Sequence, residues 1–199
     1  MSDLLPRTIG FQILFFSWSK LSGTELREKA SSNYKLEYFN VQLLGLNGHP
    51  YPALLNIQDT RETLKMKANL KFLTGDIDSY HHMSLDRGVD PSCRLCSAPC
   101  EHTQHILTEC CSTAEIRERL YPELVNLVSD IQPSCGLLNR SSNHLLTQFI
   151  IDPSSMNLPK THRISSQHPR LHELFRISRD WCFSINTCRT KLLKENNLR

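Results

Sequence analysis

Four stretches of the chain carry apolar residues at helical spacing, and polar or turn-forming stretches separate them. The longest lies near the C-terminus, where apolar or small side chains recur every three or four residues: Leu171, Leu174, Phe175, Ser178, Trp181, Cys182, Ile185, Cys188 and Leu192. This pattern predicts an amphipathic helix over residues 169–196, with Pro169 in its first turn. Such an apolar seam must pack on something, whether the preceding part of this chain, a second copy or a further partner.

The first helix that the pattern predicts begins at Asp59. The side chain of Asp59 can accept from the free amides of the first turn, and Glu62, three residues later, completes a capping box. Gly75 supplies the left-handed residue that ends such a helix. Two apolar stripes predict contacts on two sides of it: Met66, Leu70 and Leu73 form one, and Leu64, Ala68 and Phe72 form the other.

Two shorter helices are expected in the middle of the chain. Ser112 opens a second capping box ahead of an apolar face, and Pro122 should kink or break the helix that follows. Another helix should start at Ser142 or Asn143 and stop at residues 152–153, an Asp-Pro pair.

The segment 76–90 is polar and rich in turn formers. We interpret it as a loop, on which the neighbouring His81 and His82 face solvent.

Charge is concentrated in two parts of the chain. The net charge of the 199 residues is only +3, which is too weak by itself to indicate a polyanionic partner. Residues 160–199 nevertheless carry nine Lys or Arg against three acids. The helix beginning at Asp59 also carries four cations against Glu62, namely Arg61, Lys65, Lys67 and Lys71. That face is either a solvated surface or one that contacts phosphates.

The chain contains eight cysteines and no sign of a secretory leader. The apolar run 11–16 is much shorter than the ~20 residues that span a bilayer. We therefore expect an intracellular protein, in the nucleus or cytoplasm, without a membrane partner. In a reducing compartment, clustered thiols indicate metal binding more often than disulfides.

Four residues follow the spacing C-x2-C-x8-H-x4-C: Cys93, Cys96, His105 and Cys110. Two thiols two residues apart can bind one ion from a single turn, and an imidazole and a third thiol complete the tetrahedron that Zn²⁺ prefers. Because the protein supplies all four ligands, this CCHC pattern indicates a structural rather than a catalytic zinc ion.

Nearby residues compete for these roles. Cys111 is the nearest substitute for Cys110, and His102 for His105, while Cys100 falls within the loop that turns the chain back. The remaining cysteines, Cys135, Cys182 and Cys188, are typical of thiols that act as small hydrophobic side chains.

The sequence argues against an enzyme. A zinc deaminase has an H-x-E motif before its cysteine pair, and none precedes Cys93. A phosphate-binding Gly-rich loop and a G-x-S-x-G motif are also missing.

Several runs resemble the C-terminal zinc-binding segment of non-LTR (LINE-type) retrotransposon reverse transcriptases. They are KFLTG at 71–75, DPSCRLC at 90–96 and EHTQHILTEC at 101–110. The run GHP at 48–50 and the final amphipathic helix, 173–193, look like regions that flank this segment in some members. The resemblance is strongest over residues 59–120 and looser over about 45–195.

The resemblance implies the same four ligands and a role in binding element RNA or target DNA beside an RNA-directed DNA polymerase. The polymerase itself is missing, since Asp76 and Asp78 follow a helix and do not form its paired-aspartate motif. We therefore expect a non-catalytic fragment or derivative of such an enzyme's tail. Its expected nucleic-acid contacts are Lys65, Lys67, Lys71, Arg87 and Arg94.

The expected fold class is mostly α, with short helices around a small zinc-binding loop and a long C-terminal amphipathic helix. In order, we predict a poorly ordered N-terminal segment (1–56), a zinc-binding helical module (57–135), a short helix (136–152), a linker (153–168) and the C-terminal helix (169–196). The alternative functions are a zinc-ordered protein–protein interaction module, which includes self-association through the C-terminal seam, and a non-functional remnant.

Overall fold

The computed structural model describes residues 59–131, 143–153 and 169–196, together with Glu28, Ser32, Asn33, Glu37 and Tyr38. The elements are α3 (Thr60–Leu73), α4 (Tyr80–Arg87), the π-helix η4 (His105–Glu109), the 3-10 turn η5 (Cys111–Thr113), α5 (Ala114–Ile131), α6 (Asn143–Ile151) and α7 (Pro169–Glu195). No strand occurs in this part of the chain, so the mostly α fold class is confirmed. Apart from the isolated residues named above and Pro153, the predicted segments 1–56 and 153–168 lie outside it.

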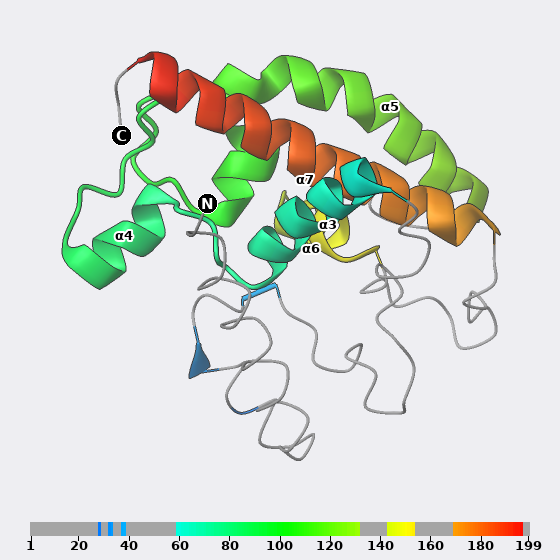
Figure 1. Ribbon diagram of the computed structural model, residues 1–199, viewed down its shortest axis with the longest axis horizontal. Coiled ribbons are helices and arrows are strands. Elements are labelled where there is room, and N and C mark those ends of the chain that lie inside the picture. Colours follow the sequence, from blue (N-terminus) through cyan, green and yellow to red (C-terminus); the bar gives the residue numbers. More distant parts are fainter. Residues whose placement is uncertain are drawn as a thin grey trace, which may run out of the picture.

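The long helix α7 organises the fold, because α3, α5 and α6 all pack against it (Figure 1). Leu174, Trp181 and Ile185, from the apolar seam predicted by the sequence, are each at most 1% exposed. The seam is therefore covered by this chain's own helices, and a second copy is not needed to cover it. Neither α7 nor any other helix among the described residues combines the length and apolar character needed to cross a membrane.

A buried amide joins three helices in the core. Asn69 of α3 donates from Nδ2 to the carbonyl oxygen of Ile151 in α6 at 2.9 Å and to Ser178 Oγ in α7 at 3.2 Å. Because a buried amide left without partners would be costly, these bonds favour one arrangement of the helices.

The N-terminal end of α3 is capped by Asp59, as predicted. Its Oδ1 accepts from the backbone N–H of Glu62 at 2.8 Å. The carboxylate of Glu62, expected to complete a capping box, instead lies 2.7 Å from Lys65 Nζ and 3.1 Å from Arg179 Nη2. Since Lys65 also lies 2.6 Å from Asp180, α3 and α7 are joined by a network of charges.

The predicted loop over residues 76–90 is wrong, because α4 occupies most of it. Ser79 Oγ accepts from the backbone N–H of His82 at the start of this helix, and Gly88, with φ 67°, ends it. Local capping thus outweighs the polar composition of an eight-residue helix. His82 is buried and His81 half-buried, so neither faces solvent freely as expected.

The helix after the cysteine motif also differs from its prediction. Ser112 does not start α5; it lies in η5, and its hydroxyl donates to the carbonyl of Leu95 at 2.9 Å. Pro122 does not break α5, which continues to Ile131 because buried apolar residues on both sides of the proline pack into the shared core. The predicted start of α6 at Asn143, and its end before Asp152, are confirmed.

Candidate metal centre

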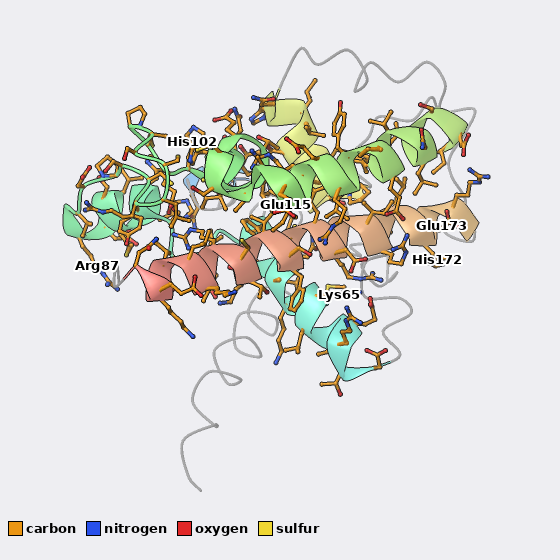
Figure 2. The ribbon with its side chains drawn as sticks, turned by 90° about the horizontal axis from the view of Figure 1, so that it is seen from above. Lys65, Arg87, His102, Glu115, His172 and Glu173 are labelled. Atoms are coloured by element: carbon orange, nitrogen blue, oxygen red, sulfur yellow. The ribbon has the colours of Figure 1, made fainter. Side chains whose placement is uncertain are left out.

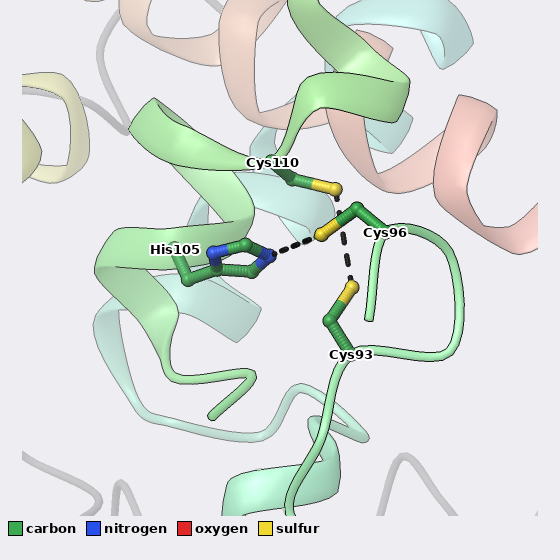
Figure 3. Close-up of side chains that lie close together, drawn as sticks. All are labelled: Cys93, Cys96, His105 and Cys110. Carbon is green, nitrogen blue, oxygen red and sulfur yellow. Dashed lines mark hydrogen bonds between the residues drawn. The ribbon is translucent and has the colours of Figure 1, made fainter. Parts of the chain in front are cut away.

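The four side chains with metal-ligand spacing lie together. One ligand atom from each of Cys93, Cys96, His105 and Cys110 lies within 4.8 Å of all the others. Figure 3 marks two of these contacts, Cys96 Sγ with His105 Nε2 at 3.3 Å and Cys93 Sγ with Cys110 Sγ at 3.9 Å. Zinc bonds of about 2.3 Å to sulfur and 2.0 Å to nitrogen place tetrahedral neighbours roughly 3.5–3.8 Å apart. These four residues are therefore close enough to hold one metal ion, as predicted.

Backbone hydrogen bonds shape the loop that carries the cysteine pair. Cys93 donates from its N–H to the carbonyl of Ala98 and accepts at its own carbonyl from Ser97, both at 2.8 Å. Ser97 takes a left-handed conformation with φ 60°, which turns the chain directly after Cys96. At the base of the loop, the N–H of Glu101 donates to the carbonyl of Pro91 at 2.8 Å.

The π-helix η4 explains how His105 and Cys110 come to lie side by side. Residues five apart on an α-helix point about 140° away from each other. In η4 the N–H of Cys110 instead donates to the carbonyl of His105 at 2.8 Å, a bond between residues five apart that widens the turn. Both side chains consequently reach the same side. The H-x4-C spacing was the signal in the sequence for this turn, although we predicted the ligands and not the π-helix.

Backbone amides near the sulfur atoms favour the thiolate forms. The amides of Leu95 and Cys96 act to lower the pKa of Cys93, although its contact with Cys110 and its burial outweigh them. Ala98 acts in the same direction on the pKa of Cys96, and Ser112 on that of Cys110. The thiolate is the form that binds metals.

Two of the thiols share a proton through their contact. The interaction with Cys110, followed by burial, raises the pKa of Cys93 to about 12. The same interaction lowers the pKa of Cys110. Because metals bind thiolates, an ion entering this site has to displace protons, and its affinity should fall as the pH falls.

The competing ligand candidates lie elsewhere. Cys100 Sγ is 3.4 Å from His81 Nδ1, outside the cluster. Nδ1 of His102 accepts from the backbone N–H of His105 at 2.9 Å, and His102 is not a member of the cluster. Cys111 is exposed and is not a member of the cluster.

The three remaining cysteines differ in their surroundings. Cys182 is buried in α7, where it packs as a small apolar residue beside Asn69, as expected. Cys188 is half-buried, and Cys135 lies outside the described residues.

A positive side chain that the sequence did not single out lies beside the cluster. Arg117 of α5 donates from Nη1 to Thr113 Oγ1 at 2.8 Å, and its charge interacts with the sulfurs of Cys110 and Cys111. Three thiolates and one imidazole around a divalent ion would have a net charge near −1, which Arg117 would offset. Only tertiary placement reveals this role.

The predicted nucleic-acid contacts are not equivalent. Lys65 is buried and bound to Glu62 and Asp180, so we leave it out of any binding surface. Figure 2 shows Lys65 on α3 beside the middle part of α7, and Arg87 well away from it, at the left edge of the described structure. Four side chains are exposed: Lys67, Lys71, Arg87 and Arg94.

Arg94 is held in place by its neighbours. Its guanidinium carbon lies 5.2 Å from the centre of the Tyr80 ring, and Nη1 is 3.6 Å from Asp90. This arrangement orients a cation at the surface of the cysteine loop.

In the comparisons with known proteins, no family model matches the chain, and no curated protein or solved structure is significantly similar to it. The resemblance to LINE-type reverse transcriptases therefore stays a prediction from the sequence.

Proposed function

We propose that this chain is a non-catalytic, zinc-ordered helical module that binds nucleic acid. The observation that carries the proposal is the closed Cys3His cluster, in which Cys93, His105 and Cys110 are buried and all four ligand atoms lie within 4.8 Å. With four protein ligands, the ion has no open position for water or substrate, as in structural zinc sites. Three soft sulfur ligands favour Zn²⁺ over the hard cations Mg²⁺ and Ca²⁺.

The ion's proposed role is to hold the cysteine loop against the helices. The loop has few apolar side chains of its own, and few backbone bonds hold it, namely those of Cys93 with Ser97 and Ala98 and those of Glu101 with Pro91 and His81. A structural zinc ion contributes on the order of 10 kcal/mol in small peptides, which is enough to order such a segment. The centre would itself be anionic, so phosphate contacts have to come from the surrounding residues.

We assign those contacts to two exposed pairs. Lys67 and Lys71 lie one turn apart on α3, and Arg87 and Arg94 lie at the end of α4 and on the cysteine loop. Their exposure supports the assignment, as does the resemblance to a family that binds element RNA or target DNA. Exposed lysines and arginines bind phosphates without reading the sequence, so we expect salt-dependent affinity.

A titration with labelled single-stranded RNA and duplex DNA at low salt tests this proposal. We expect each double variant, Lys67→Glu with Lys71→Glu and Arg87→Glu with Arg94→Glu, to bind about tenfold more weakly or worse. The slope of log K against log salt should shrink by about one for each lost contact. The double variant Lys191→Glu with Lys194→Glu, which makes the same charge change at two exposed sites near the end of α7, is the control and should change binding little. No binding by the wild-type chain, or equal losses in all variants, would refute the proposal.

The alternative of a protein-interaction module loses its main support in this fold. The apolar seam that was expected to bind a partner is buried against α3, α5 and α6. The large apolar residues exposed in the described part of the chain are three separate leucines: Leu64, Leu85 and Leu145.

A further inference from the structure

A carboxylate lies fully buried inside the cysteine loop, which is called the metal-binding loop from here on. Glu101, between the cysteine pair and His105, is 0% exposed. Its backbone N–H closes the base of the loop on Pro91, and its carbonyl oxygen accepts from His81 at 3.4 Å. A buried charge is costly unless it is paired, so a specific partner should accompany it.

That partner comes from the far end of α7. Arg189, 5% exposed, donates from Nη2 to Glu101 Oε1 at 2.5 Å and to the carbonyl of Asp78 at 2.8 Å. Glu101 Oε1 also accepts from the backbone N–H of Tyr80 at 3.1 Å. One carboxylate oxygen thus joins the metal-binding loop, the start of α4 and the C-terminal end of α7. In Figure 1 that end of α7, drawn in red, lies beside the green loops around α4.

The ion pair of Glu101 and Arg189 contributes less to stability than its burial suggests. Glu101 Oε2 and Arg189 Nε have no hydrogen-bond partner among the described residues. A buried ion pair with unsatisfied atoms stabilises a fold less than well-packed apolar residues of the same size, but it fixes the position of the groups it joins. The ion pair between Glu101 and Arg189 is therefore better explained by its effect on the position of the segments that it joins than by its contribution to stability.

We propose that Glu101 is a positioning residue for the metal centre, which it fixes to the C-terminal end of α7 through Arg189. The inference rests on the proposed zinc site. Glu101 lies in the stretch between Cys96 and His105, so holding it in place limits the distance between the two halves of the ligand set. The coupling is reciprocal: an ion bound at the centre also favours docking of the end of α7.

The test compares three variants of the full chain. Two of them each change one member of the Glu101–Arg189 pair, and the third changes another buried arginine of α7. Glu101→Gln keeps the shape of the side chain and removes its charge, and Arg189→Met removes the cation. Arg179→Met is the matched control, because Arg179 is a similarly buried arginine of α7, ten residues before Arg189, and pairs with Glu62 of α3. Zinc affinity is measured by competition with a chromogenic chelator, at a temperature where circular dichroism shows every variant folded.

We expect Glu101→Gln and Arg189→Met to bind zinc about tenfold to a hundredfold more weakly, and Arg179→Met to bind it as the wild type does. A general loss of stability would affect all three alike. Equal zinc affinity in all three variants would overturn the inference and leave the zinc centre standing. A wild-type chain that binds no zinc would overturn both.

Hydrogen exchange gives a second measurement that needs no variant. Removing zinc from the wild-type chain should speed exchange of the amides at 185–195 more than that of the amides at 174–180, in the other half of the same helix. If zinc removal changes both groups equally, or changes neither, the proposed coupling is absent. This result decides the matter even where Glu101→Gln fails to fold.

Discussion

The contact between α7 and the π-helix leads to a quantitative prediction for Trp181→Phe. Trp181 is 1% exposed, and its indole N–H donates to the carbonyl of Leu107 in η4 at 3.1 Å. A π-helix leaves carbonyls without their usual α-helical partners, and this bond satisfies one of them. Phenylalanine fills most of the same space but cannot donate.

The expected loss has two parts. Leaving the buried carbonyl of Leu107 without a donor costs about 1–3 kcal/mol. The phenylalanine side chain is roughly 40 Å³ smaller, and at about 24 cal/mol per Å³ the resulting cavity costs about 1 kcal/mol. The free energy of unfolding of Trp181→Phe should therefore fall by about 2–4 kcal/mol, and its melting temperature by about 6 °C or more.

Urea unfolding followed by far-ultraviolet circular dichroism measures this loss without depending on tryptophan fluorescence. Phe183→Leu is the control, since Phe183 is a half-buried aromatic residue on the same helix, and it should lose less than about 1 kcal/mol. If Trp181→Phe loses no more than Phe183→Leu, α7 does not bind η4 in this way, and the position assigned to η4, which carries His105, is wrong.

Three further predictions concern the helical core. Leu174→Asp places a charge at a site 1% exposed, so the helical signal in circular dichroism should collapse; a variant that stays folded and changes only its oligomeric state in sedimentation would show that the seam binds a second copy. Burial raises the pKa of Glu62, but Lys65 and Arg179 outweigh it, so the pKa is lowered from 4.5. The stability that Glu62 contributes is therefore present above about pH 4.5 and is lost as the pH falls through the lower folded-state pKa. With chelator present throughout, Glu62→Gln should flatten the loss of stability between about pH 5 and pH 3. An unchanged profile would contradict the ion pairs of Glu62 with Lys65 and Arg179. Pro122→Ala restores a backbone donor inside α5 and should raise the free energy of unfolding by about 1–3 kcal/mol, whereas a lower melting temperature would mean that the helix depends on a bend there.

Features with a local cause were predictable from the sequence. Asp59 caps α3 through an amide three residues away, and Gly75 follows that helix with φ 64°. The clustering of Cys93, Cys96, His105 and Cys110 was predictable, because few side chains bind zinc and the two-residue spacing is short. The seam of α7 was predictable from its period, although its partner was not.

Features that depend on distant residues were not predictable. Lys65 looked like one of four equivalent surface cations, and only the position of Asp180, 115 residues further along the chain, shows that it is an internal ion pair. Glu101 and Arg189 lie 88 residues apart, and nothing in either local sequence indicates that they meet. Composition likewise did not reveal α4, because its start and end depend on two single residues, Ser79 and Gly88.

Zinc bound to the purified chain, counted by native mass spectrometry, tests the central claim most directly. We predict one ion per wild-type chain, lost in Cys93→Ser and His105→Ala and retained in Cys188→Ser, which changes a half-buried thiol outside the cluster. A wild-type chain without zinc, or a His105→Ala variant that holds zinc as tightly as the wild type, would contradict the metal centre on which this account depends.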